Sequence, residues 1–199
     1  MSRVAVIAAA PAAAIRRPQL SLIGTGTVGT AFVARGQQLA RRGLVLPRLA
    51  ALANTRGAVE CGDDAGEALR VVKLARGDSD AGFALPHSQL RPGDIVVDAT
   101  ASDLVASRHA RWLASGVHVV TANKLGNGAD LLRAQAIARA QRDGGTHYGD
   151  AATVGAGLPL LRTIRELVAG GDHIHAVEGV LSGSLAWLFD QYDGMRPFS

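Results

Sequence analysis

Short apolar runs alternate with longer amphipathic stretches along most of the chain. The apolar runs have the length of buried strands and occupy residues 19–24, 47–54, 94–100, 117–123 and 146–150. Between them, apolar residues recur at helical spacing over residues 28–43, 63–77, 101–116 and 128–145. Parallel strands need a crossover connection, and that connection is usually a helix. The pattern therefore predicts an α/β fold with a doubly wound parallel sheet over residues 18–150.

Local signals at the helix ends agree with this pattern. Asp63 and Asp64 open the second predicted helix, and Ser102 has a side chain suited to the N-cap of the third. Residues 78–93 are rich in turn-forming residues, which predicts a loop.

The order of elements changes beyond residue 150. A helix is predicted at 159–171, a strand at 173–183 and the opening of a further helix at 184–194. Residues 151–199 are therefore interpreted as the start of an incomplete α+β domain. Residues 1–17 are interpreted as a disordered N-terminal extension.

Composition limits the partners and the compartment. Apolar residues make up 48% of the 199 residues and aromatic residues 4%, so the core must be aliphatic. The net charge is +4, but the basic residues are scattered, which argues against a nucleic-acid partner. A single cysteine, Cys61, excludes an internal disulfide and fits the cytoplasm. The Ala-rich start is broken by Pro11 and followed by Arg16 and Arg17, unlike an export signal, and no run is long enough to span a membrane.

Three glycines within six residues follow the first predicted strand, in the sequence GTGTVG. Gly24 permits a tight turn, Gly26 lets a pyrophosphate approach the backbone, and Gly29 lets the helix pack closely on the strand. The helix that they open directs its free N–H groups and positive dipole end at the phosphates. With a strand before it and a helix after it, this motif predicts a Rossmann-like dinucleotide-binding domain rather than a glycine turn without a ligand.

The end of the second predicted strand indicates which dinucleotide binds. An acidic residue there normally bonds the ribose hydroxyls of NAD, but this chain has Asn54, Thr55 and Arg56. Thr55 and Arg56 are suited to a 2′-phosphate, so the sequence favours NADP. NAD stays open, since Arg56 is equally well explained as a solvated surface side chain.

Lys124 ends the fourth predicted strand, at the carboxyl edge where open α/β sheets bind their ligands. With Lys73 it is one of two lysines in a chain that has 19 arginines. An ammonium group exchanges a proton more readily than a guanidinium, which suits it to chemistry at a carbonyl. Lys124 is therefore a candidate catalytic residue, and a solvated loop lysine is the alternative.

Five motifs together carry a family resemblance: GTGTVG, VVDAT, VVTANK, ATVGAGLP and EGVLSGSL. In the order and spacing of these motifs, the chain resembles homoserine dehydrogenase from about Gln19 to its last residue. The likeness is strongest to the form fused to aspartate kinase. The resemblance implies reversible reduction of L-aspartate 4-semialdehyde to L-homoserine with NAD(P)H, on the route to threonine and methionine. It also implies that residues 151–199 begin the catalytic domain.

The resemblance further implies site residues. The cofactor is expected against Gly24, Gly26, Thr27, Val28, Gly29, Thr100 and Ala101. Lys124 matches a lysine beside the cofactor and the reacting carbon. Glu178 matches the acid that holds the substrate ammonium group, with a paired surface glutamate as the alternative. Gly179 and Ser182 match positions where the backbone approaches the nicotinamide and the substrate.

The glycine-containing stretch ATVGAGLP matches a loop that binds a monovalent cation, Na⁺ or K⁺, through backbone carbonyls. The matching positions are Val154, Ala156 and Leu158. An acid of the family's loop matches Ala151 here, and the nearest acid, Asp150, is one residue away. Oxygen ligands favour such a cation over a transition metal.

The resemblance implies a longer protein, with a downstream lysine as proton donor, so the chain is expected to be an N-terminal fragment. One hypothesis is an oxidoreductase whose remaining residues come from elsewhere, for instance from a separate chain. The other is a catalytically silent NADP-binding remnant. The expected partners are the missing C-terminal portion or further copies of the chain in a homo-oligomer. Leu185, Trp187, Leu188 and Phe189 are expected to form an exposed apolar edge that promotes self-association. His173 and His175 are expected to be exposed histidines rather than metal ligands.

Overall fold

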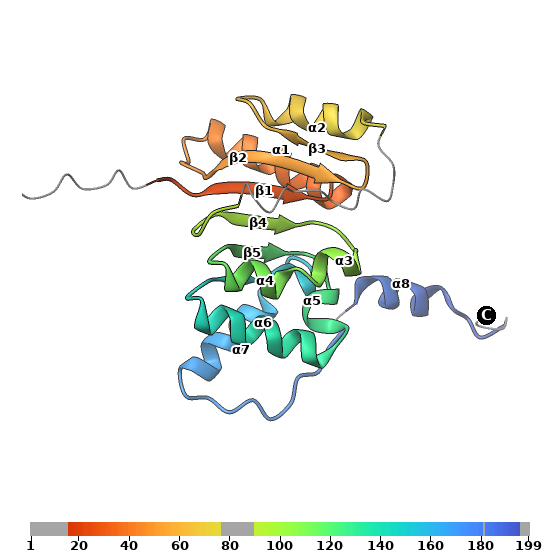
Figure 1. The fold of residues 1–199 in the computed structure, drawn as a ribbon. Coiled ribbons are helices and arrows are strands. Elements are labelled where there is room, and N and C mark those ends of the chain that lie inside the picture. The colour runs from red at the N-terminus through yellow and green to blue at the C-terminus, as the bar shows by residue number, and fades with distance from the viewer. Residues whose placement is uncertain (1–15, 77–89, 181, 196–199) are drawn as a thin grey trace, which may run out of the picture.

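The computed structural model describes residues 16–76, 90–180 and 182–195. They form one six-stranded sheet with helices packed against it (Figure 1). Its strands are β1 (Gln19–Ile23), β2 (Arg48–Asn54), β3 (Gly57–Glu60), β4 (Ile95–Asp98), β5 (His118–Thr121) and β6 (Tyr148–Gly149). They lie in the order β3-β2-β1-β4-β5-β6, and every pair is parallel except β2 with β3. The predicted doubly wound parallel sheet is thus confirmed.

Helices cover both faces of the sheet. One face is covered by α1 (Thr27–Arg41) and α2 (Ala65–Leu74), and the other by α3 (Asp103–Ala106), α4 (His109–Ala114) and α6 (Leu131–Asp143). The further helices are α5 (Leu125–Gly128), α7 (Leu160–Ala169) and α8 (Gly183–Gln191). A short 3₁₀ turn, Ala151–Thr153, follows β6. Among the described residues, no helix has the length and apolar character needed to cross a bilayer.

The strand alternation divides the core into two layers. Leu22 packs with apolar residues of α1 and α2 on one face, and its neighbour Ile23 packs with those of α3, α4 and α6 on the other. The same alternation separates Val97 from Val96 in β4. Because successive side chains of a strand point to opposite faces, two helical layers are needed to bury both sets.

Strand β3 was not predicted from the sequence. It forms because the chain reverses after β2, where Asn54 Oδ1 accepts hydrogen bonds from the backbone N–H groups of Arg56 (2.7 Å) and Gly57 (3.1 Å). The returning segment then pairs antiparallel with β2. This side-chain-to-backbone turn replaces the dipeptides that usually mark a hairpin.

The helix predicted at 101–116 is divided into α3 and α4. Ser102 caps α3 as expected, because its Oγ accepts from the Val105 N–H. The helix is interrupted at Ser107 and Arg108, where the Ser107 hydroxyl donates to the Leu104 carbonyl. The break turns His109 into the buried core.

The strand predicted at 173–183 is wrong. Residues 173–180 have no regular secondary structure, and α8 begins at Gly183. A strand needs a hydrogen-bonded neighbour, and within the described ranges nothing but β5 pairs with β6 at that edge. Figure 1 shows α8 beyond the carboxyl ends of the strands, away from the helical layers. The apolar side chains of α8 are exposed, as expected.

Several other expectations are not decided by the fold. Most of the predicted loop at 78–93, and almost all of the N-terminal extension, lie outside the described residues. The division of the chain into domains at residue 150 stays a prediction. His173 and His175 are exposed.

Candidate functional site

The three glycines after β1 have different surroundings. Gly24 has a φ of +97°, and a Cβ there would lie 2.7 Å from the carbonyl oxygen of Ala99 at the end of β4. A Cβ on Gly29 would overlap the carbonyl oxygen of Gly24, whereas a Cβ on Gly26 would meet nothing within 4 Å. Gly24 and Gly29 therefore let strand and helix approach closely, and Gly26 leaves open space for a ligand.

The N-terminus of α1 faces that open space. Gly26 is its N-cap residue, no side chain caps the helix, and its first turn contains no acidic residue. Gly26, Thr27 and Val28 are exposed. Uncapped N–H groups and the positive end of the helix dipole form a suitable site for an anion such as a pyrophosphate.

A cavity of about 430 Å³ extends from this helix terminus across the ends of β1, β2 and β4. It is lined by Gly24, Thr25, Gly26, Asn54, Thr55, Arg56, Lys73, Ala99 and Thr100. The lining contains two cationic side chains and no carboxylate. The cavity therefore suits a ligand that carries several negative charges.

Asn54 ties the end of β2 to the glycine turn. Its Nδ2 donates to the Thr25 hydroxyl (3.1 Å) and the Val72 carbonyl (3.0 Å), while its Oδ1 holds the turn that carries Arg56. Every polar atom of this buried amide is thus engaged. Asn54 fixes the wall of the cavity and has no further bond to offer a ribose.

Lys73 also lines the cavity, although the sequence did not predict it as a site residue. It lies on α2, is half-buried, and donates from Nζ to the Thr30 hydroxyl at 2.7 Å. Its rarity in an arginine-rich chain was the available signal, but only the packing of α2 beside α1 places it in the cavity with Arg56.

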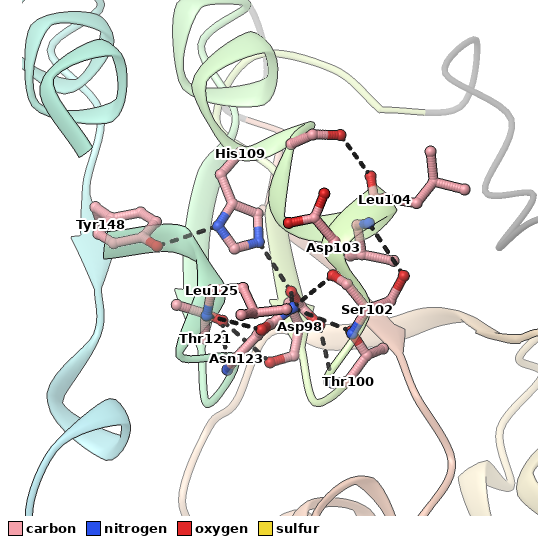
Figure 2. A network of polar contacts seen from close by, with 12 residues as sticks. Asp98, Thr100, Ser102, Asp103, Leu104, His109, Thr121, Asn123, Leu125 and Tyr148 are labelled. Carbon is pink, nitrogen blue, oxygen red and sulfur yellow. Dashed lines mark hydrogen bonds and ion pairs between the residues drawn. The ribbon is translucent and has the colours of Figure 1, made fainter. Parts of the chain in front are cut away.

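The turns after β4 and β5 form the other part of the same edge (Figure 2). Asp98 Oδ1 accepts from the Thr100 N–H at 2.8 Å, and Asn123 Nδ2 donates to Asp98 Oδ2 at 3.0 Å and to the Ser102 carbonyl at 2.9 Å. Lys124 follows as the exposed N-cap residue of α5. The strands therefore place Gly24, Thr100, Ala101 and Lys124 at one carboxyl edge.

Among the described residues, no side-chain hydrogen bond or ion pair brings the candidates near the C-terminus to this edge. Glu178 and Gly179 lie in the exposed irregular segment before α8, and Ser182 Oγ caps α8 by accepting from the Leu185 N–H at 3.2 Å. Within the described part of the chain, no hydrogen bond or ion pair joins Glu178 to Lys124.

The candidate cation loop contains two successive left-handed residues, Gly155 (φ +71°) and Ala156 (φ +52°). Ala156 is the single residue other than glycine with positive φ in the described ranges. Such a backbone is strained and changes the direction of successive carbonyl groups. No group of three or more His, Cys, Asp or Glu side chains suited to a metal is present among the residues searched.

Asp150, the acid nearest to that loop, is engaged elsewhere. It is 2% exposed, and its two carboxylate oxygens accept from the Arg165 guanidinium at 2.6 and 2.8 Å. Asn127 Nδ2 donates to the same carboxylate at 2.9 Å. Burial alone would raise the pKa of Asp150, but Arg165 and Asn127 outweigh it and hold that pKa below its ordinary value.

Comparison with known proteins identifies the N-terminal part of the chain. The family model for "Homoserine dehydrogenase, NAD binding domain" matches residues 24–149. The chain is 43% identical over 115 residues to a chloroplastic bifunctional aspartokinase/homoserine dehydrogenase 1 of Zea mays, across 58% of this chain and 12% of that protein. It is 35% identical over 193 residues to bifunctional aspartokinase/homoserine dehydrogenase 2 of Escherichia coli K12, across 92% of this chain and 24% of that protein.

A solved structure extends the likeness to the fold of most of the chain. The crystal structure of a Candida auris protein of unknown function superimposes with a TM-score of 0.66 at 31% identity, over 88% of this chain and 50% of that one. The chain thus spans half, or much less than half, of the length of these proteins.

Proposed function

Because the chain belongs to the homoserine dehydrogenase family and contains its NAD-binding domain, we propose that it binds NADP and serves the interconversion of L-aspartate 4-semialdehyde and L-homoserine. The observation that carries this proposal is the cavity beside the glycine turn. Its open space at Gly26, uncapped helix terminus and cationic lining fit a phosphorylated dinucleotide.

NADP rather than NAD is supported by the far end of the cavity. Arg56 and Lys73 both line it, and the lining has no carboxylate to bond two ribose hydroxyls. Asn54 is fully hydrogen-bonded within the protein and does not replace that carboxylate. A 2′-phosphate between Arg56, Lys73 and the Thr55 hydroxyl compensates both cations.

The carboxyl ends of β4 and β5 are proposed to hold the nicotinamide half. Bound NADPH supplies the hydride. Thr100 and Ala101 lie at the turn after β4, and Lys124 presents its ammonium group at the turn after β5. In this position, Lys124 stabilises negative charge that develops on a reacting carbonyl oxygen, or exchanges a proton with it.

Glu178, Gly179 and Ser182 are proposed to contact the substrate when their segment lies over the cofactor. A carboxylate at Glu178 neutralises the ammonium group of an amino-acid substrate. The exposed, irregular backbone at 173–180 is consistent with a segment that takes its position with the help of further protein.

We also propose that Na⁺ or K⁺ binds the carbonyl oxygens of Val154, Ala156 and Leu158. The left-handed pair at Gly155 and Ala156 supports this. Asp150 does not contribute a ligand, because Arg165 occupies its carboxylate. The cation is therefore expected to bind weakly, through neutral oxygen atoms. Cytoplasmic location is proposed on the single buried thiol, Cys61.

The alternative function is that of a catalytically silent NADP-binding protein. Homoserine-dependent reduction of NADP⁺ distinguishes the two, with calorimetric titration of NADPH on the same sample. Turnover by the chain, alone or with the C-terminal portion of a homoserine dehydrogenase added, supports the dehydrogenase, and binding without turnover in both assays supports the silent protein. If NADPH does not bind, both are wrong.

A further inference from the structure

A buried chain of three polar side chains lies beneath α5 and is not used by the proposed function. His109, the first residue of α4, is 0% exposed. Its Nε2 lies 2.9 Å from Asp98 Oδ2, and its Nδ1 lies 3.1 Å from the Tyr148 hydroxyl (Figure 2). We call Asp98, His109 and Tyr148 the buried relay. It joins β4, α4 and β6.

The three side chains have complementary hydrogen-bonding atoms. A carboxylate accepts hydrogen bonds, so we place a ring proton on His109 Nε2, which donates to Asp98. In the neutral tautomer with its proton on Nε2, Nδ1 accepts from the Tyr148 hydroxyl, whose pKa is raised by burial and by the charges of Asp150 and Asp98. In that tautomer, one ring proton serves both contacts.

The buried relay reaches the cofactor edge through Asn123. Asp98 Oδ2 accepts from both His109 and Asn123 Nδ2. Asn123 is also buried, donates to the Ser102 carbonyl, and accepts from the Leu125 N–H at 3.1 Å. One amide thus joins the turn after β4 to the start of α5, directly beside Lys124.

The backbone of α5 also rests on the buried relay. A Cβ on Gly126 would overlap the Tyr148 hydroxyl and lie 3.0 Å from His109 Nδ1. The helix has four residues and no side-chain cap. A helix of one turn is not stable by itself, so its position depends on the groups beneath it. Lys124 is therefore held from both sides, at Asn123 and at Gly126.

A packing role alone does not explain a histidine here. His109 lies against the rings of Trp112 (centroids 5.9 Å apart) and Tyr148 (5.6 Å), and an apolar ring would fill such a space without the cost of burying polar atoms. The polar side chain instead gives the Asp98 carboxylate a third donor, besides the Thr100 N–H and Asn123 Nδ2, and this donor helps to fix the carboxylate orientation on which Asn123 depends.

We infer that His109 is a positioning residue, which acts through Asp98 and Tyr148 to hold Asn123–Gly126 so that Lys124 faces the nicotinamide half of the dinucleotide site. This inference rests on the proposed function. The role of His109 is therefore confined to the nicotinamide half, where the Thr100 N–H also donates to Asp98. Among the described residues, no side-chain hydrogen bond joins the three relay residues to Asn54, Arg56 or Lys73 in the adenosine half.

The test compares two ligands on the same variants. NADPH contacts both halves of the site, whereas 2′-phospho-ADP-ribose lacks the nicotinamide. In His109→Phe, the affinity for NADPH is expected to fall about tenfold. The affinity for 2′-phospho-ADP-ribose should stay within about twofold of the wild-type value. In His109→Gln, which keeps an N–H donor for Asp98, most of the NADPH affinity is expected to return.

The outcomes separate the two claims. Equal changes for both ligands in His109→Phe, or none, overturn the positioning role. A wild-type chain that binds neither ligand overturns the proposed function, and the inference with it. If His109→Phe does not fold, as judged by circular dichroism, Tyr148→Phe replaces it. That variant is expected to lose about threefold in NADPH affinity alone, and unchanged binding overturns the inference.

Discussion

Asn54 donates a hydrogen bond to the Thr25 hydroxyl at 3.1 Å and so ties the end of β2 to the glycine turn after β1. The two groups are 29 residues apart in the chain. This bond joins the expected 2′-phosphate site at Thr55 and Arg56 to the expected pyrophosphate site at Gly26. The end of β2, which is expected to set the preference for NADP, is thus connected to the glycine turn, which is expected to set the affinity for the dinucleotide.

Gly29 and Gly26 are expected to respond differently to alanine. Gly29→Ala places a Cβ against the Gly24 carbonyl, so it should lower the free energy of unfolding by about 1–3 kcal/mol. Gly26→Ala meets open space and should leave stability unchanged while weakening NADPH about tenfold. Urea unfolding and calorimetric titration measure the two effects.

Gly36 provides the matched control in the interior of α1. Its Cβ would also meet nothing within 4 Å, but it does not line the cavity beside the glycine turn. Gly36→Ala should therefore stabilise the chain by about 0.5–1 kcal/mol, through helix propensity, with NADPH binding unchanged. Weaker NADPH binding in Gly36→Ala to the extent seen in Gly26→Ala would count against a specific role for Gly26.

Arg56→Leu and Lys73→Met are expected to reduce the preference for NADPH over NADH. Each removes one cation from the expected 2′-phosphate site, so NADPH should weaken about tenfold, with little change for NADH. Arg70→Leu is the control, because Arg70 lies on α2 outside the cavity and pairs with Glu67. A tighter wild-type affinity for NADH than for NADPH would contradict the assignment.

The Asp150–Arg165 pair predicts a pH dependence of stability. The pKa of Asp150 is lowered in the folded chain, so the pair stabilises the fold above the unfolded value of about 3.9 and this contribution is lost as the pH falls below it. In Arg165→Met the buried carboxylate loses its main partner, which should cost about 1–3 kcal/mol at pH 7. Arg165 is itself 57% exposed, so solvent limits the effect.

The difference between Arg165→Met and the wild type should shrink as the pH falls from 7 to 3, because protonation of Asp150 removes the charge that Arg165 compensates. Urea unfolding at pH 7, 5 and 3 measures it. Arg162→Met is the control, since Arg162 pairs with the exposed Glu166. A difference that stays constant across this range would show that Arg165 acts through packing.

The exposed apolar side chains of α8 are expected to cause self-association. Trp187 is 66% exposed and Phe189 is 61% exposed, on a helix that lies away from the two helical layers. Replacing both with serine should shift the chain toward the monomer in sedimentation equilibrium at micromolar concentration. A wild-type chain that is already monomeric under these conditions contradicts the prediction.

The sequence predicted the features that depend on neighbouring residues. The glycine turn could be predicted because the spacing of Gly24, Gly26 and Gly29 in one short segment is typical of a strand–turn–helix that binds a dinucleotide. Asp64 and Ser102 likewise cap the helices that follow them. Such signals can be recognised in the sequence because the interacting groups are within a few residues of each other.

The features that were missed depend on residues far apart in the chain. His109 is 39 residues from Tyr148 and 11 from Asp98, and only the packing of α4 on the sheet brings the three together. Lys73 enters the cavity through the packing of α2 beside α1. The strand predicted at 173–183 is wrong for the converse reason: its apolar pattern is suitable, but a strand also needs a partner at the sheet edge.

The most direct test of the account is calorimetric titration of the wild-type chain with NADPH, with displacement by 2′,5′-ADP. One site per chain, competition by 2′,5′-ADP and about tenfold weaker NADPH binding in Gly26→Ala are expected. The absence of saturable binding of NADPH and NADH at millimolar concentration, to a chain shown to be folded, would contradict it.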